Sequence, residues 1–250
     1  MKVHRVFLAL VAFLSTAACN AAQVTEVRVE YVGEGTKVLF VGNSYLYFND
    51  IPGIVQALAD SAKGERLAVA VVAGADAALM DHWNEGTARR AIAAGGLKWV
   101  VLQQGPSSVE VNRDTLRLAT KLFGDEIARA NARVALFSAW PTAARRDDFP
   151  RAIESYTLAA ADVNGLLLPV AAAWIAAWDA TPTLELYADP LHPSLEGAYL
   201  SALVVYAQLL DKSPAGLPAS LRLRSGRTLA IDPATAILLQ QAAATATGRQ

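Results

Sequence analysis

The sequence predicts a single doubly wound α/β domain, in which about five parallel strands are sandwiched between helices. Short continuous apolar segments alternate with amphipathic helical segments, which is the pattern of a parallel sheet buried on both faces. The composition of 54% hydrophobic and 18% charged residues supplies a large apolar core. With 250 residues and no break in composition, the chain is long enough for one such domain.

The first residues are interpreted as an export signal. Lys2 and Arg5 give a positive start, residues 6–14 form a short apolar run, and small residues follow. The segment that ends at Cys19 resembles a bacterial lipoprotein cleavage box, in which Cys19 becomes the acylated first residue of the mature chain. We expect an exported protein of the periplasm or outer membrane, with this lipid as its membrane contact; a freely secreted chain is the alternative.

The residue counts argue against several classes of partner and cofactor. Cys19 is the only cysteine, so neither an internal disulfide nor a cysteine-based metal site is expected. Removal of residues 1–18 lowers the Lys and Arg count from 22 to 20 against 23 Asp and Glu, and the resulting net charge of about −3 argues against nucleic acid. The chain has three histidines and lacks His-Glu-x-x-His and glycine-rich nucleotide loops, so no metal and no cofactor are expected. A small basic cluster, interpreted as solvated surface, consists of Arg222, Arg224 and Arg227.

The strands are expected in the following order after a signal peptide over 1–18. Residues 19–36 contain an alternating pattern from Val24 to Val32, which predicts an edge strand or a tether, and the domain proper is expected over 37–250. Continuous apolar segments then predict buried strands at 38–41, 67–73, 99–103, 134–139 and 166–170.

The helices are indicated by their first residues and their apolar faces. Asp50 and Pro52 begin the first helix, Ser194 caps a long later one, and Asp232 with Pro233 begins the last. Between the first and the long helix, further helices are expected at about 77–94, 114–130 and 151–163.

Polar and glycine residues follow several of the expected strands. In an open parallel sheet the ligand site lies outside the carboxyl ends of the strands. At or just beyond these ends stand Ser44, Gly74, the 103–108 segment and Trp140. The loop that carries Asp189 and His192 follows the last strand, so it can close over the same edge.

Three side chains provide the nucleophile, the base and the orienting acid that serine catalysis requires. A serine hydroxyl becomes a good nucleophile when an imidazole accepts its proton and an acid orients that imidazole. Ser44, Asp189 and His192 occur in this order, and a tight turn over 189–192 can bring the carboxylate to Nδ1 while Nε2 faces Ser44.

Together these residues resemble the SGNH hydrolases, also called the GDSL esterases and lipases, over about residues 37–211. Gly42-Asn43-Ser44-Tyr45 stands where that family has Gly-Asp-Ser-Leu, and Asp189-Pro190-Leu191-His192 matches its Asp-x-x-His. The resemblance implies a flavodoxin-like sheet and a serine esterase. In that esterase Ser44 attacks the ester carbonyl, His192 carries the proton and Asp189 orients His192.

The expected oxyanion hole is where the chain departs from the family. Gly74 matches the family's oxyanion glycine. The usual Gly-x-Asn-Asp is missing, and Gln103 or Gln104 offers an amide in place of the asparagine, which indicates a bacterial branch of the superfamily with glutamine in this loop. Gln103 is the preferred candidate because the strand ends there.

Three further residues are candidates to line the substrate cleft. Asn43 is expected beside the nucleophile, His82 either lines the cleft or is hydrogen-bonded locally on a helix, and Trp140 either faces a sugar ring or packs in the core. The expected substrate is an O-acetyl or short-chain acyl ester, on a cell-envelope or other polymeric carbohydrate. The alternatives are a phospholipid or lysophospholipid acyl hydrolase, an acyltransferase, and a non-catalytic glycan-binding lipoprotein on the same fold.

Overall fold

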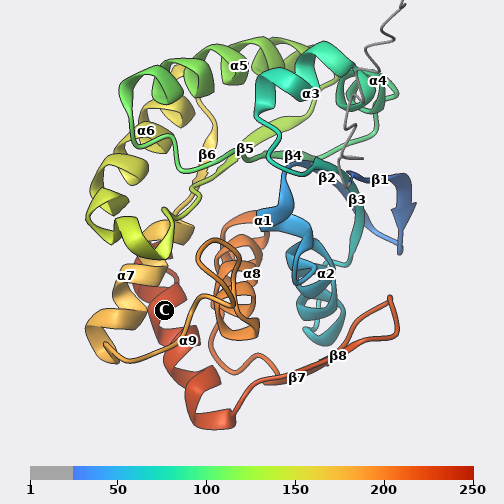
Figure 1. The fold of residues 1–250 in the computed structure, drawn as a ribbon. Coiled ribbons are helices and arrows are strands. Elements are labelled where there is room, and N and C mark those ends of the chain that lie inside the picture. Colours follow the sequence, from blue (N-terminus) through green and yellow to red (C-terminus); the bar gives the residue numbers. More distant parts are fainter. Residues whose placement is uncertain (1–24) are drawn as a thin grey trace, which may run out of the picture.

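Five parallel strands form the centre of the sheet in the computed structural model, which describes residues 25–250 (Figure 1). They are β2 (Thr36–Gly42), β3 (Leu67–Gly74), β4 (Trp99–Leu102), β5 (Arg133–Phe137) and β6 (Leu166–Leu168). Their spatial order is β3-β2-β4-β5-β6, and all neighbouring pairs are parallel. The predicted doubly wound sheet is confirmed, and this strand order is the flavodoxin-like one.

β1 (Thr25–Val32) adds a sixth, antiparallel strand along the outer edge of β3. The pairing runs from Thr25 opposite Gly74 to Val32 opposite Val69, with an irregularity in between. Of the two alternatives, edge strand and tether, the structure has the edge strand. The predicted signal peptide and the lipidation site Cys19 lie outside the described residues.

Helices cover both faces of the sheet (Figure 1). One layer consists of α3 (Leu79–Glu85), α4 (Thr87–Ala93), α5 (Glu110–Arg129) and α6 (Phe149–Asp162). The other consists of α2 (Ile51–Ser61), α7 (Val170–Ala180), α8 (Leu195–Leu210) and α9 (Pro233–Thr247). Within the layers, α5 packs against α3 and α6, and α8 packs against α2 and α9.

Three segments differ from the prediction, one of them the helix expected over 114–130, which begins four residues earlier at Glu110. The helix expected over 77–94 is divided at Gly86, whose φ of 86° ends α3 and begins α4. The strand expected to run to residue 170 ends at Leu168, and Pro169 precedes α7. Within residues 25–250, none of the helices is both long enough and apolar enough to span a membrane.

The basic cluster lies on a hairpin formed by β7 (Ser220–Arg222) and β8 (Thr228–Ala230). Its interpretation as solvated surface is incomplete, because two of its arginines hold the hairpin to the domain. Arg224 binds the Asp60 carboxylate of α2 at 2.9 Å, and Arg227 donates to the Asn49 carbonyl at 2.6 Å.

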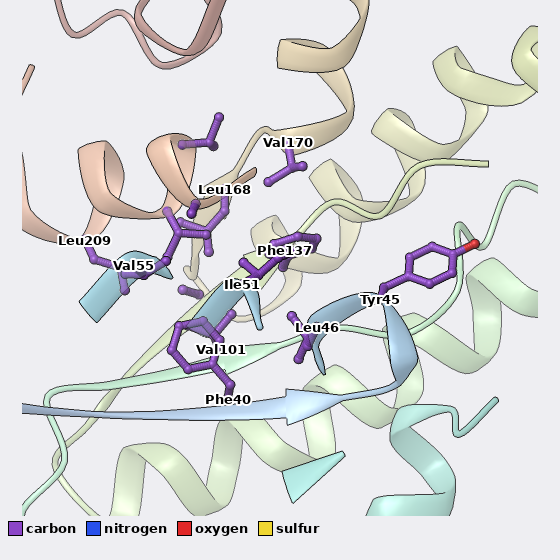
Figure 2. Packing of buried hydrophobic residues seen from close by; sticks show 14 of the residues in the cluster. Phe40, Tyr45, Leu46, Ile51, Val55, Val101, Phe137, Leu168, Val170 and Leu209 are labelled. Atoms are coloured by element: carbon purple, nitrogen blue, oxygen red, sulfur yellow. The ribbon is translucent and has the colours of Figure 1, made fainter. Parts of the chain in front are cut away.

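The core on the α2 side of the sheet fixes the strand ends that carry the site. Figure 2 shows Phe40, Val101 and Phe137, from three adjacent strands, in one cluster with Ile51 and Val55 of α2, and all five are fully buried. Each such side chain contributes about 1.5–3 kcal/mol by leaving water.

The chain order places a crevice at the carboxyl ends of β2 and β4. The connection from β2 leads to β3 on one side, and the connection from β3 returns to β4 on the other side. Ligands bind at such reversal points in open α/β sheets. Ser44 follows β2 and Gln103 follows β4, so both stand at this crevice.

Candidate active site

Ser44 is the first residue of α1 (Ser44–Tyr47), a single helical turn directly after β2. Asn43 caps this turn, because its Oδ1 accepts the N–H of Tyr45 at 3.2 Å, and its backbone carbonyl accepts the N–H of Leu46 at 3.0 Å. The first N–H groups of a helix have no partner within the helix. The N–H groups of Tyr45 and Leu46 are both bound to Asn43. The N–H of Ser44, which precedes them, is not used by this cap.

The loop before Ser44 needs glycine at position 42. A Cβ at Gly42 would lie 2.2 Å from Gln103 Oε1 and 2.7 Å from Leu46 Cδ1, so a larger residue would displace the loop. The nucleophile position therefore depends on close contact between the ends of β2 and β4.

The loop that carries His192 has little regular structure but is held at four consecutive carbonyl groups, those of residues 190–193. Their donors, in order, are the N–H of Ala143, the indole N–H of Trp140, the N–H of Ala188 and the side-chain amide of Asn49, at 2.8–3.0 Å. The donors come from the segment after β5, from the loop itself and from the end of α1. The loop is thus fixed from several sides.

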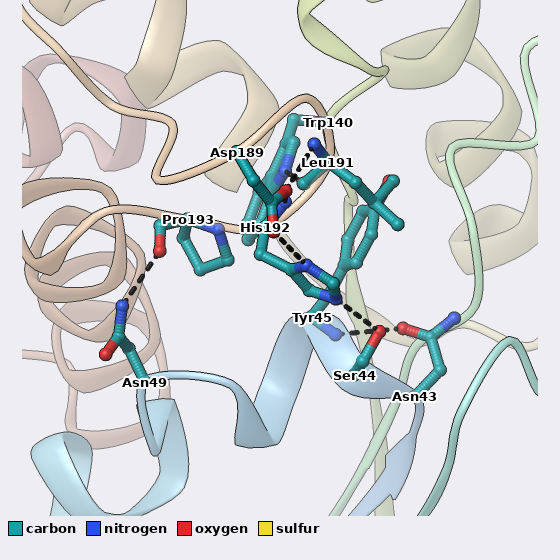
Figure 3. A network of polar contacts seen from close by, with 9 residues as sticks. All are labelled: Asn43, Ser44, Tyr45, Asn49, Trp140, Asp189, Leu191, His192 and Pro193. Atoms are coloured by element: carbon teal, nitrogen blue, oxygen red, sulfur yellow. Dashed lines mark hydrogen bonds and ion pairs between the residues drawn. The ribbon is translucent and has the colours of Figure 1, made fainter. Parts of the chain in front are cut away.

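The structure brings Ser44, His192 and Asp189 together, as the sequence predicted (Figure 3). The Asp189 carboxylate is 2.7 Å from Nδ1 of His192, and Nε2 of the same ring is 3.0 Å from the Ser44 hydroxyl. Since an ionised carboxylate only accepts, Nδ1 carries the proton and Nε2 can accept the proton of Ser44. This is the arrangement that activates a serine.

Asp189 is held in its ionised form. Burial raises the pKa of its carboxyl, but hydrogen bonds from the backbone and ring of His192 and from the N–H of Leu191 outweigh burial, so the pKa is lowered. Its Oδ1 accepts both backbone N–H groups at 2.7 Å. One carboxylate therefore closes the Asp-x-x-His turn and orients the imidazole.

The structure places Gln103 away from the cavity, with its amide turned toward the nucleophile loop. Gln103 is fully buried, and its Oε1 accepts the N–H of Asn43 at 2.9 Å. Its Nε2 donates to Asn43 Oδ1 at 3.0 Å and to the Gln104 carbonyl at 2.6 Å. In this position Gln103 supports the nucleophile loop rather than presenting a donor to substrate.

Gln104 lines the same cavity as Ser44. Its Oε1 accepts the N–H of Leu79 at 3.1 Å, while Nε2 donates to Ser107 Oγ at 2.9 Å and, over a long 3.4 Å, to the Asn112 carbonyl. Gly74 lies at the end of β3, and its loop borders the cavity through residues 76–78.

His82 and Trp140 are buried supports of the site and do not line the cavity. Nε2 of His82 donates to the Gly42 carbonyl at 2.6 Å, and burial lowers the pKa of this imidazole although the hydrogen bond to Gly42 opposes the shift. His82 therefore matches neither alternative fully: it does not line the cavity, and its hydrogen bond is to a residue 40 positions away at the end of β2. Trp140 stacks between Tyr45 and Trp174, with ring centroids 4.8 and 4.2 Å away, so it packs in the core.

Asn43 borders the cavity but is also engaged by the protein. Besides capping α1, it donates from Nδ2 to the Ala77 carbonyl at 3.2 Å. It therefore ties the nucleophile loop to the loop after β3.

A cavity of about 390 Å³ opens beside Ser44 and runs across four strand ends, from the loop after β3 to the segment after β5. Besides Asn43 and Ser44, the polar side chains that line it include Asp76, Gln104, Ser107, Asn112, Thr115, Thr142 and Arg145. The Arg145 guanidinium pairs with Asp148, a carboxylate that is 5% exposed and also accepts from Ser108 Oγ at 3.1 Å. This pair of a half-exposed guanidinium and a buried carboxylate fixes the wall of the cavity on the β5 side.

The sequence prediction missed most of these lining residues. Asp76, Thr142 and Arg145 follow the ends of β3 and β5, so the strand-end rule that selected Ser44 would also have found them. Asn112 and Thr115 lie on α5, where no pattern distinguishes them from other exposed helix positions. Within residues 25–250, no group of three or more His, Cys, Asp and Glu side chains is placed to hold a metal ion.

Comparisons with known proteins give matches among solved structures. A scan against protein-family models finds no match, and neither does a search of curated proteins. The chain is similar to a putative SGNH hydrolase from Slackia heliotrinireducens, with 27% identity, a TM-score of 0.61, and coverage of 70% of this chain and 100% of that one.

Two other structures share the fold at lower identity. A DUF4886 family protein from Bacteroides uniformis has a TM-score of 0.68 and 16% identity, over 85% of this chain and 95% of that one. A lipase/acylhydrolase from Enterococcus faecalis has a TM-score of 0.57 and 15% identity, over 70% of this chain and 95% of that one.

Proposed function

The chain has the fold of the SGNH hydrolases, and we propose that it is a serine esterase that hydrolyses acyl esters with Ser44 as the nucleophile. The observation that carries this proposal is the position of His192, which contacts the Ser44 hydroxyl with one ring nitrogen and the Asp189 carboxylate with the other. A glycan-binding protein would not need this pair of contacts.

The reaction follows from these contacts. Nε2 of His192 takes the proton of Ser44 Oγ while the oxygen attacks the ester carbonyl, and the same proton then passes to the leaving alcohol. Water attacks the resulting acyl-serine, again giving a proton to His192, which returns it to Ser44. Asp189 stays ionised throughout, in keeping with its lowered pKa, and stabilises the imidazolium that forms.

For the oxyanion we propose three donors: the backbone N–H of Ser44, the side-chain amide of Gln104 and the backbone N–H of Gly74. The first is the helical donor that the Asn43 cap does not use. Gln104 lines the cavity, and exchange of its long bond to the Asn112 carbonyl for a bond to the oxyanion frees the required N–H. Gly74 remains a proposed backbone donor from the neighbouring loop.

The cavity favours a short acyl group on a polyhydroxylated alcohol. Its two end walls are polar, with Asp76 on the β3 side and Arg145 on the β5 side, and Ser44 and Gln104 lie between them beside apolar atoms of Ala77, Pro106 and Leu191. Such walls suit hydroxyl groups and disfavour a long alkyl chain, which would cover polar groups without replacing their hydrogen bonds with water. We therefore propose O-acetyl or similar short esters on a carbohydrate as the substrate class.

The decisive experiment is hydrolysis of 4-nitrophenyl acetate by wild type and Ser44→Ala. We expect kcat to fall by about 10³-fold or more in the variant. Ser61→Ala, which removes an exposed hydroxyl at the end of α2, is the matched control and should keep wild-type activity. Equal activity of Ser44→Ala and wild type would refute the assignment.

Labelling with a fluorophosphonate separates an enzyme from a binding protein on the same fold. Only an activated serine reacts readily with this reagent. We expect one label, lost in Ser44→Ala and strongly slowed in His192→Ala. An unlabelled wild-type chain that still binds glycans would favour the binding protein.

We also propose that the chain is exported and anchored by a lipid at Cys19. The support is the sequence pattern of a positive start, a short apolar run and a cleavage box. Metabolic labelling with an alkyne fatty acid tests it. We expect the label on wild type and its loss in Cys19→Ala; equal labelling of the two would contradict the proposal.

A further inference from the structure

Two consecutive residues directly after α1, Phe48 and Asn49, contact the loop that carries His192. The Phe48 ring stacks on the His192 imidazole, with centroids 4.3 Å apart and planes 9° from parallel. The Asn49 amide donates to the Pro193 carbonyl at 2.8 Å, directly after the histidine (Figure 3). Both contacts join the helix of the proposed nucleophile to the loop of the proposed base without passing through the Ser44 hydroxyl.

The short helix itself links Ser44 to Phe48. The N–H of Phe48 donates to the Ser44 carbonyl at 2.9 Å, which is one full turn of helix. Residues four apart lie on the same face of a helix. The Ser44 hydroxyl therefore meets the edge of the imidazole while the Phe48 ring covers its face.

These contacts supply a restraint that the hydrogen bonds of the ring do not. The bonds at Nδ1 and Nε2 lie in the plane of the imidazole, so they resist sliding of the ring more than tilting about the line that joins the two nitrogens. A ring stacked on the face opposes that tilt. An aromatic face also attracts the imidazolium that forms when Ser44 gives up its proton.

Phe48 is held in place although it is 43% exposed. Asn49 fixes the chain after it, because Arg227 of the β7–β8 hairpin donates to the Asn49 carbonyl at 2.6 Å and to its Oδ1 at 3.4 Å. With Oδ1 facing Arg227, the amide nitrogen is the group that reaches Pro193.

We propose that Phe48 and Asn49 are positioning residues that hold the His192 imidazole at the distance and tilt needed to take the proton from Ser44. The proposal rests on the proposed esterase function. It gives the exposed Phe48 ring a role in positioning His192, and it gives the β7–β8 hairpin a role in holding Asn49 in place.

The test uses three variants of the full mature chain with 4-nitrophenyl acetate and the fluorophosphonate. Phe48→Leu keeps an apolar side chain but removes the flat face, Phe48→Tyr restores the face, and Asn49→Ala removes the amide. Because small displacements of a catalytic group are costly, we expect kcat and the labelling rate to fall about 10-fold in Phe48→Leu and Asn49→Ala. KM should stay within about 2-fold, and Phe48→Tyr should be close to wild type.

Two controls test whether the effect is specific to this position and depends on His192. Ile237→Ala trims a side chain of α9 that is 57% exposed, and it should change neither kcat nor the labelling rate. In a His192→Ala background the effect of Phe48→Leu should disappear, since residues that act as a unit are not additive.

Several outcomes would overturn the proposal. One is a wild-type kcat in both Phe48→Leu and Asn49→Ala. A second is a rise in KM with unchanged kcat in these variants. A third is that Phe48→Leu lowers the residual activity of His192→Ala as much as it lowers the activity of the wild type. If Phe48→Leu does not fold, the kcat of Asn49→Ala decides. Equal activity of wild type and Ser44→Ala would instead refute the esterase function itself, so the two failures are distinct.

Discussion

Replacement of Gln103 by leucine separates a structural amide from a catalytic one. The substitution keeps most of the side-chain volume and removes the three hydrogen bonds that Gln103 makes. One buried group, the N–H of Asn43, is left without its acceptor. The other two lose one partner each but keep another, because Asn43 Oδ1 still accepts from Tyr45 and the Gln104 carbonyl still accepts from Tyr156 at 2.7 Å.

The magnitude follows from this count. An orphaned buried donor costs about 1–3 kcal/mol, and each of the two other lost bonds costs about 0.5–1.5 kcal/mol. The free energy of unfolding should therefore fall by about 2–6 kcal/mol in Gln103→Leu. Urea denaturation measures the change as a lower midpoint with an unchanged m-value.

Gln240→Leu is the matched control. Gln240 is also buried, and its amide accepts from Gly216 at 2.8 Å and donates to Leu217 and Tyr199 at 2.8 and 3.2 Å, far along the chain from the triad. It should lose a similar free energy of unfolding and keep its kcat. A Gln103→Leu variant that kept its stability within about 0.5 kcal/mol and lost about 10²–10³-fold in kcat would contradict the structural role of Gln103, because that is the behaviour of an oxyanion donor.

Four further predictions concern the site and its supports. Gln104→Leu should lower kcat for 4-nitrophenyl acetate by about 10²-fold with little change in KM, whereas a change in KM alone would point to ground-state binding. Because burial lowers the pKa of His82 from 6.5, the unfolded chain takes up a proton before the folded chain does, and stability should fall as the pH drops below 6.5. His82→Gln, whose amide can still donate to Gly42, should show a smaller loss between pH 7.5 and 5 in urea denaturation; equal losses would contradict this assignment. Trp140→Phe keeps the aromatic stack but removes the donor to the Leu191 carbonyl, so the lost bond should cost about 1 kcal/mol of stability, in addition to the cost of the smaller ring in the core, and should lower kcat severalfold; an unchanged kcat would show that this bond does not fix the His192 loop. The kcat/KM for nitrophenyl acetate should exceed that for the octanoate by about 10-fold or more, and the reverse order would favour a lipid acyl hydrolase.

The sheet and the triad were predictable because each leaves a local signature. Apolar strands that are buried on both faces read as continuous runs, and residues at their carboxyl ends must share one edge. The Asp-x-x-His spacing allows a tight turn, and the structure closes it with two N–H groups on Asp189. These features depend on neighbours in sequence or on a general rule of topology.

The orientation of Gln103 was not predictable in the same way. Its partner Asn43 is 60 residues away, and only the contact between β2 and β4 decides which way the amide turns. The division of the 77–94 helix failed for a different reason. The helical pattern continues through Gly86, and the left-handed backbone there becomes visible only in three dimensions.

The antiparallel strand β1, which covers the edge of the sheet, bears on whether a shortened chain would self-associate. β3 is buried along its whole length, and its partner on the outer side is β1. A chain shortened to begin at Lys37 would lose that cover and present a row of open peptide groups flanked by valines, which is a template for self-association. Residues from Thr25 onward therefore belong in any recombinant form of the domain.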